Sequence, residues 1–279
     1  MIDKDLVGQG RQYHIACQAG EVGRYVFLPG DPGRASLIAG CLEDARPIAQ
    51  NREFVTFTGT IDGTSVSVCS TGIGSPSAAI ALEELAAIGA DTFIRIGRSG
   101  GLQPDLRVAS MVVATGAVRD EGTSRAYLPI EFPAVADLAV VNALIDAASA
   151  LRVSYRYGVV ESKDAFFAEV RPETMPIADE LRARWRAYRR AGVLCSDMET
   201  AALLVISYAK KVRAGSLLLI SDNQFAGQQL GPEPSMDETI RVGVEAVRRL
   251  IRIDERLIPI RVGSEAASQP PPLPESRES

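Results

Sequence analysis

The stretch Thr92-Phe-Ile-Arg-Ile-Gly-Arg-Ser-Gly-Gly-Leu102 joins a short apolar run to a segment rich in glycine. The apolar and β-branched residues predict a buried strand, and the glycines predict a turn in which backbone N–H groups can approach an anion. Arg95 lies inside the apolar run, and Arg98 lies in the predicted turn. Because a buried guanidinium needs an opposite charge, Arg95 is expected to meet either a ligand anion or a structural carboxylate.

The composition is typical of a globular protein with a sizeable core, since the chain has 279 residues and is 46% hydrophobic. No apolar run approaches the ~20 residues of a membrane span, and residues 1–10 lack the apolar core of a signal peptide, so we expect a cytoplasmic protein with no membrane partner. The net charge of −5 argues against a nucleic-acid partner. Four scattered cysteines and a single histidine, His14, indicate neither a disulfide framework nor a metal site.

Strands and helices are predicted to alternate along most of the chain. Strands are predicted at residues 25–28, 53–60, 65–70, 92–96, 108–115, 158–160 and 214–220, and helices at residues 35–42, 77–88, 134–150, 178–190, 201–209 and 237–251. This alternation predicts an α/β fold with a mainly parallel sheet, whose ligands gather at the carboxyl ends of the strands. We expect one domain over residues 1–262, a long loop at 224–234, and a disordered tail rich in Pro, Ser and Glu at 263–279.

Charged and hydroxyl side chains recur directly after the predicted strands: Arg34, Arg95, Arg98, Ser99, Asp197, Glu199 and Asp222. Arginine suits a phosphate because the guanidinium binds two oxygens at once. Glu199 suits a diol or a backbone N–H at a helix start, and Asp222 suits either a ligand or an Asx-turn. Each residue alone has an ordinary structural explanation, but their repetition at successive strand ends favours a common ligand site.

Several motifs, in order over residues 13–252, resemble the nucleoside phosphorylase family, and most closely its uridine phosphorylase branch. They are Leu28-Pro-Gly-Asp-Pro-Gly-Arg34, Asn51-Arg-Glu-Phe54, Cys69-Ser-Thr-Gly-Ile-Gly-Ser-Pro-Ser77, Arg95-Ile-Gly97, Glu131-Phe-Pro-Ala-Val-Ala-Asp137 and Asp197-Met-Glu199. The resemblance implies a three-layer α/β/α sandwich with a central mixed β-sheet, usually assembled into a hexamer of dimers. It also implies a pentosyltransferase that cleaves a nucleoside with inorganic phosphate as co-substrate and without a cofactor.

The resemblance and the polar residues at the strand ends together suggest a role for each candidate residue. Phosphate would be bound by Gly30, Arg34, Arg52, Arg95, Arg98 and Ser99, ribose by His14, Met198 and Glu199, and the base by Phe166, Glu169, Arg171, Asp197 and Asp222. Among them, Arg95, Glu199 and Asp222 would act in catalysis. His14 and Arg52 would reach across a dimer interface into the site of a neighbouring subunit.

Arg98 departs from the family pattern, which has Thr or Ser at this position. An arginine adds a charge and several heavy atoms at the centre of the site, and three interpretations follow. The protein is a phosphorylase whose base specificity has diverged from uridine; or a nucleosidase or nucleotide N-glycosidase in which Arg98 replaces phosphate; or a non-catalytic homologue that binds nucleosides.

The residues that would read the base also depart from the uridine branch, which has a Gln-x-Arg pair after the phenylalanine. Aligned without a gap, the pair becomes Val170 and Pro172; with a one-residue deletion it becomes Glu169 and Arg171. A carboxylate in place of an amide removes the donor, so neither alignment matches the edge of uracil. Asp222 follows a serine, as in the purine branch, where the aspartate protonates N7 of the leaving purine.

Overall fold

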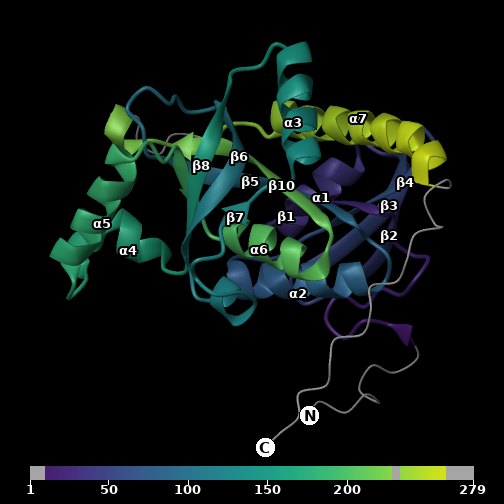
Figure 1. Ribbon diagram of the computed structural model, residues 1–279, viewed down its shortest axis with the longest axis horizontal. Helices are drawn as coiled ribbons and strands as arrows, with labels where there is room; N and C mark the ends of the chain where they lie inside the picture. The colour runs from purple at the N-terminus through teal and green to yellow at the C-terminus, as the bar shows by residue number, and fades with distance from the viewer. Residues whose placement is uncertain (1–9, 228–232, 262–279) are drawn as a thin grey trace, which may run out of the picture.

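The computed structural model describes residues 10–227 and 233–261, and within them ten strands form one mixed sheet. The sheet lies between two layers of helices (Figure 1). One face is covered by α1 (Pro32–Ala39), α3 (Leu138–Ala150) and α7 (Asp237–Arg261), and the other by α2 (Ser75–Ala87) and α6 (Thr200–Lys210). The expected α/β/α sandwich with a central mixed sheet is therefore confirmed.

Part of the sheet closes on itself. The strand order is β10-β6-β8-β9-β5-β1-β4-β3-β2, and β10 also pairs with β5, so five strands form a closed circuit from which the others extend. The strands are β1 (Tyr25–Pro29), β2 (Glu43–Asn51), β3 (Phe54–Ile61), β4 (Thr64–Cys69), β5 (Thr92–Gly101), β6 (Met111–Asp120), β7 (Ala134–Val135), β8 (Tyr155–Lys163), β9 (Cys195–Asp197) and β10 (Arg213–Asp222). Strand β5 belongs to both parts, because it pairs with β1, β9 and β10.

The central strands are apolar because helices cover both of their faces. Every residue of β1 is buried, and β10 is buried from Ala214 to Ile220, which is typical of parallel strands at the centre of a sheet. Strands β1 and β10 both run parallel to β5, with Leu28 and Ser216 on either side of Arg95. Their carboxyl ends therefore meet at one edge of the sheet.

Helix α1 begins earlier than the sequence predicts. Its first residue is Pro32, and the Asp31 side chain caps it by accepting a hydrogen bond of 2.9 Å from the Gly33 amide. Proline at the first helical position needs no N–H, and aspartate is a favoured N-cap. Arg34 consequently lies in the first turn of a helix rather than in a loop.

The prediction that glycines end the strand of Arg95 is wrong. Strand β5 continues through Gly97 and Gly100 to Gly101. A Cβ at Gly97 would lie 2.7 Å from Nη2 of Arg95, and a Cβ at Gly101 would lie 2.6 Å from Nδ2 of Asn223. The glycines therefore make room for neighbouring side chains instead of forming a turn.

Three further expectations need correction. Strand β2 was not predicted, because it is a polar edge strand whose residues are mostly exposed. The predicted helix at 134–150 divides into β7 and α3, because Asp137 caps α3 through hydrogen bonds to the amides of Ala139 and Val140. Strand β8 extends to Lys163, three residues beyond the predicted strand.

The C-terminal part contains the predicted last helix, which is longer than expected, and part of the predicted loop. Helix α7 continues to Arg261, beyond the predicted end. Of the predicted long loop, the structure describes residues 224–227, where a short 3-10 helix lies, and residues 233–234. The predicted tail at 263–279 lies outside the described residues.

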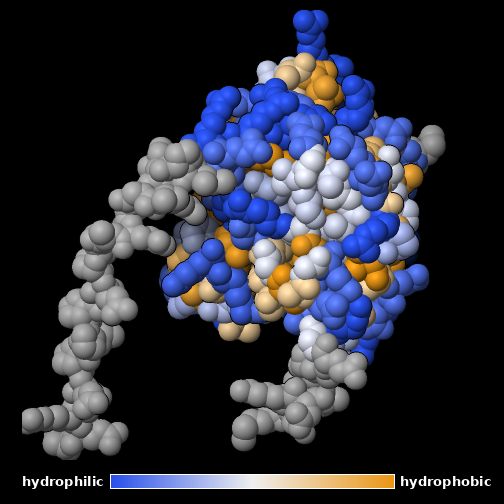
Figure 2. Space-filling view, turned by 90° about the vertical axis from the view of Figure 1, so that its right-hand side faces the viewer, coloured by the Kyte–Doolittle hydropathy of each residue, from blue (hydrophilic) through white to orange (hydrophobic). Residues whose placement is uncertain are grey.

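The main core lies between the sheet and its two helix layers. Its buried side chains include Phe27, Phe93, Leu82, Leu204 and Val247, from β1, β5, α2, α6 and α7. The face on the side of β2 to β4 is mostly hydrophilic with small hydrophobic patches (Figure 2). The core therefore holds the strand ends in place.

Gly101→Ala is predicted to lower the free energy of unfolding by about 1–3 kcal/mol, because the new methyl group overlaps a buried amide. That amide belongs to Asn223, which donates to the carbonyls of Gln103 and Leu106. Gly40→Ala is the control, since Gly40 has a helical φ of −62° and alanine is tolerated there. Urea denaturation of both variants measures the difference; equal stability would contradict the close approach at Gly101.

Candidate active site

A cavity of about 810 Å³ lies at the carboxyl ends of β1, β5, β8 and β10. Most of the predicted site residues line it: Gly30, Arg34, Arg95, Arg98, Ser99, Phe166, Glu169, Asp197, Met198, Glu199 and Asp222. They come from separate parts of the chain, and the strand ends bring them together. The cavity therefore lies at the edge of the sheet where the sequence predicts ligand binding.

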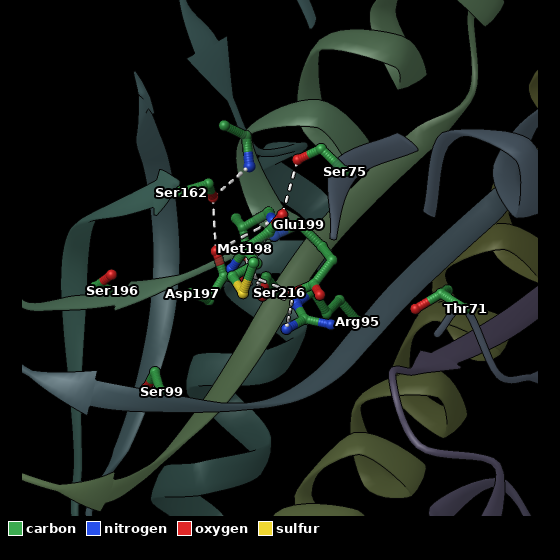
Figure 3. A network of polar contacts seen from close by, with 12 residues as sticks. Thr71, Ser75, Arg95, Ser99, Ser162, Ser196, Asp197, Met198, Glu199 and Ser216 are labelled. Atoms are coloured by element: carbon green, nitrogen blue, oxygen red, sulfur yellow. Dashed lines mark hydrogen bonds and ion pairs between the residues drawn. The ribbon is translucent and has the colours of Figure 1, made fainter. Parts of the chain in front are cut away.

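Asp197 is the hub of a buried polar network at the floor of this cavity (Figure 3). It accepts hydrogen bonds from Arg95 Nε at 2.8 Å, from Ser162 Oγ at 2.6 Å and from Thr200 Oγ1 at 2.6 Å. Both carboxylate oxygens are thus used within the protein. Asp197 joins β5, β8 and α6, and its expected contact with a base stays a prediction.

Arg95 lies between two carboxylates. Besides Asp197, it pairs through Nη2 with Glu199 Oε2 at 2.5 Å, and only 5% of its side chain is exposed. Glu199 Oε1 accepts a hydrogen bond of 2.6 Å from the Gly74 amide. Burial raises the pKa of Glu199 above its ordinary value, although Arg95 opposes this rise. Arg95 therefore meets structural carboxylates, as one of its two interpretations expects, while a ligand anion at its remaining N–H groups stays a prediction, and Glu199 lines the cavity in an ion pair.

The cavity has a positive end, where the guanidinium groups of Arg34, Arg95 and Arg98 gather. Burial lowers the pKa of Arg34, and the charges of Arg98 and Arg95 lower it further. Within the part of the chain that the structure describes, Arg95 Nη1 is buried without a hydrogen-bond partner. Guanidinium groups that crowd around one space favour an anion with several oxygens, such as phosphate.

The Arg98 side chain reaches toward the segment before α7. Its Nη1 lies 3.1 Å from Glu233 Oε2, and its Nη2 donates to the Pro234 carbonyl at 3.1 Å. Both Arg98 and Glu233 line the cavity. Arg98 therefore lies at the border of the positive end, and 22% of its side chain is exposed to the cavity and solvent.

Away from the arginines, the cavity is lined by Phe166, Glu169 and Asp222. Phe166 presents a half-exposed ring from α4 (Phe166–Val170). Burial raises the pKa of Asp222, and Lys163 partly offsets the rise. The turn after β10 is capped by the neighbouring Asn223, whose Oδ1 accepts from the amides of Phe225 and Ala226. The side chain of Asn223 thus forms the Asx-turn at this position, and the side chain of Asp222 is not needed for it.

The cavity wall also contains polar residues that were not singled out in the sequence, among them Lys163 and Ser196. Lys163 ends β8, and Ser196 lies in the short strand β9. The sequence contained a signal for Lys163, because Glu161 and Lys163 lie two residues apart in a strand and therefore place two charged side chains on one face of it. The signal was lost because the strand was predicted to end at Val160.

Three predicted residues do not line the cavity of this chain. His14 Nδ1 lies 2.6 Å from Glu84 Oε1, and the Asn51 side chain donates to the His14 carbonyl. Arg52 is exposed, and its guanidinium lies 5.8 Å from the centre of the Tyr13 ring. Arg171 lies over the Phe167 ring instead, also at 5.8 Å.

No cluster of three or more His, Cys, Asp or Glu side chains suited to a metal ion occurs within residues 10–227 and 233–261. In the same residues, no helix is both long and apolar enough to cross a membrane.

Fold and cavity together define an α/β protein whose cavity has an arginine-rich end, a carboxylate beside it and an aromatic wall. Residues 24–259 match the Phosphorylase superfamily, and the chain belongs to this family.

Similar proteins extend over most of the chain. It is 48% identical to a uridine phosphorylase of Treponema pallidum (strain Nichols) over 246 residues, which are 87% of this chain and 95% of the relative. It is 43% identical to a uridine phosphorylase of Thermococcus kodakarensis over 88% of this chain and 89% of the relative. A guanosine phosphorylase of Halorubrum lacusprofundi is 40% identical over 87% of this chain and 96% of its own length. Relatives named for a pyrimidine and for a purine nucleoside are thus similarly close.

Asp197→Ala is predicted to lower the free energy of unfolding by about 3–5 kcal/mol, because it leaves the buried Arg95 with one carboxylate instead of two. Asp179→Ala is the control, since Asp179 is fully exposed and pairs with Arg182 on the surface of α5 (Ala178–Arg190). Chemical denaturation compares the two. A loss no greater for Asp197 than for Asp179 would contradict its role as the hub of the network.

Proposed function

We propose that the protein is a nucleoside phosphorylase, which cleaves the N-glycosidic bond of a nucleoside with inorganic phosphate to give a free base and ribose or deoxyribose 1-phosphate. The observation that carries this proposal is one cavity with an arginine-rich end, a carboxylate paired with one of those arginines, and an aromatic wall. Relatives named uridine phosphorylase and guanosine phosphorylase, similar over most of the chain, support it. Phosphate is the co-substrate, and no cofactor is needed.

In this proposal, phosphate binds at Arg34, Arg95 and Arg98, next to Gly30 and Ser99. Arg95 is held rigid by two carboxylates, so its remaining N–H groups are positioned before the ligand arrives. Cleavage of the N-glycosidic bond gives the sugar a partial positive charge, and a phosphate held below C1′ stabilises this charge and then attacks it. Fixed guanidinium groups thus supply both charge and orientation.

The sugar and the base occupy the rest of the cavity. Glu199 accepts hydrogen bonds from ribose hydroxyls next to Met198, and the ring of Phe166 stacks on the base. Asp222 donates a proton to the departing base, and burial, which raises its pKa, favours the acid form that this step requires. Since the relatives include enzymes named for uridine and for guanosine, base specificity that differs from uridine is compatible with the family.

The proposal includes an assembly of dimers, up to a hexamer, in the cytoplasm. Its support is that His14 and Arg52 lie near Tyr13 and Asn51, outside the cavity of their own chain. Such residues are available to the site of a second copy, where Arg52 would reach phosphate and His14 the ribose 5′-hydroxyl.

The test is base release from a panel of nucleosides and nucleoside 5′-monophosphates, with and without phosphate. Release that needs phosphate, with sugar 1-phosphate as the second product, supports the proposal. Release without phosphate would instead favour a nucleosidase or nucleotide N-glycosidase in which Arg98 replaces phosphate. Binding of nucleosides without any release would favour a non-catalytic homologue.

Arg98→Gln is predicted to raise the KM for phosphate by about 10- to 100-fold, the value of a hydrogen bond to a charged group. Arg107→Gln is the control, because Arg107 is exposed and does not line the cavity. Initial rates at varied phosphate measure both. An unchanged KM in the Arg98 variant would show that Arg98 serves only to hold Glu233.

Asp222→Asn is predicted to lower kcat by about 10²–10⁴-fold, because an asparagine amide can donate a hydrogen bond but is too weak an acid to transfer a proton to the base. A raised pKa keeps Asp222 protonated to a higher pH than a free aspartate. The wild-type rate should therefore fall as pH rises through this pKa, and the variant should lack that fall. Asp105→Asn, at an exposed residue paired with Arg156, is the control for kcat and for the pH profile.

A further inference from the structure

A buried ion pair forms one wall of the cavity, away from the three arginines. Lys163 and Glu169 are in direct contact through Nζ and Oε2, and about a tenth of each side chain is exposed, 9% and 13%. Lys163 Nζ also donates to Ser196 Oγ at 2.5 Å, and Ser196 Oγ donates to Glu161 Oε2 at 2.6 Å. In Figure 3, Ser196 lies on the opposite side of Asp197 from Arg95.

The pair retains hydrogen-bonding capacity. An ammonium has three N–H donors, and the polar contacts of Lys163 in the described chain use two of them, on Glu169 and Ser196. The described contacts of Glu169 use Oε2, which accepts from Lys163 and lies 3.0 Å from Ser196 Oγ, and this leaves Oε1 as an acceptor. Both side chains line the cavity beside Phe166.

The carboxylates around Lys163 stabilise its positive charge. Burial lowers the pKa of Lys163, but Glu169 and Glu161 outweigh this effect and raise it above the ordinary value. Lys163 therefore remains an ammonium, which donates and never accepts. The carboxylate of Glu169 accepts and never donates. The wall thus offers a donor and an acceptor side by side, in fixed roles.

We propose that the Lys163–Glu169 pair selects nucleosides whose base presents a lactam edge, a ring N–H next to a carbonyl oxygen. Lys163 donates to the carbonyl, and Glu169 accepts from the ring N–H. Hypoxanthine, guanine, uracil and thymine present this edge. Adenine and cytosine present a ring nitrogen next to an amino group, which would place an acceptor against Glu169 and a donor against Lys163.

The inference rests on the proposed function in one respect, because phosphate at the arginines directs the base toward the opposite wall. The pair also supplies the hydrogen-bond donor that the sequence comparison did not find beside Glu169. Glu169 alone has no donor for a base carbonyl, but Lys163, which ends β8, brings one into contact with it. Two residues six positions apart thus do together what an amide side chain does alone.

The first experiment measures binding of free bases to the wild-type protein by calorimetry, and it requires neither turnover nor a variant. Hypoxanthine is compared with adenine, and uracil with cytosine, since each pair differs at the edge in question. We expect the lactam base of the size that fits to bind at least about 10-fold more tightly than its amino counterpart. Equal affinity within both pairs would overturn the inference.

The second experiment changes the wall. Lys163→Met is expected to weaken binding of the lactam base by about 10- to 100-fold while the amino base changes little. The double variant Lys163→Met/Glu169→Leu removes both charges together and is expected to abolish the preference, without leaving one charge of the pair buried alone. Lys210→Met is the matched control, because Lys210 pairs with Glu83 on the surface and lies outside the cavity lining.

The outcomes separate this inference from the proposed function. If the variants lower phosphate-dependent release equally for all nucleosides, or keep the wild-type preference, the pair is only structural and the inference is wrong. Selective binding of lactam bases that disappears in the double variant would confirm the role of the pair. If, in addition, no nucleoside is cleaved with phosphate, the role of the pair stands and the phosphorylase proposal fails.

Discussion

The buried guanidinium of Arg95 is the constraint on which the site depends. It lies in the central strand β5, between β1 and β10, where an unpaired charge would be very costly. Asp197 and Glu199 neutralise it from one side, at 2.8 and 2.5 Å. Because these carboxylates come from the end of β9 and the start of α6, the ion cluster fixes the junction of three elements before any ligand binds.

This arrangement also couples the positive end of the cavity to the carboxylate of Glu199. Glu199 bonds at once to Arg95 and to the Gly74 amide at the start of α2. An anion that binds Arg95 draws positive charge away from Glu199, and a hydroxyl group that binds Glu199 competes for its oxygens. Phosphate and sugar would therefore each alter the partner of the other through one shared ion pair.

The sequence predicts the fold where local pattern and tertiary environment agree. Helix α5 was predicted with its observed bounds, because its charged face and buried Leu181 and Trp185 follow a helical repeat. Strand β5 shows the opposite case, since Gly97 makes room for Leu218 of β10 and Gly101 for Asn223 just after β10, and neither contact is visible in the local pattern. Strand β2 was missed because an exposed edge strand has no apolar alternation to detect.

The candidate site was predictable as a set of residue types but not as a set of contacts. Motifs place Arg34, Arg95, Glu199 and Asp222 at strand ends, and the cavity contains all of them. An alignment compares one position with one position, whereas a ligand meets atoms irrespective of the residue that carries them. Lys163 illustrates the difference, because the donor that is missing beside Glu169 in the sequence arrives from the end of another element. Specificity in such a cavity can therefore change through pairs of substitutions that are distant in the sequence but in contact in the fold.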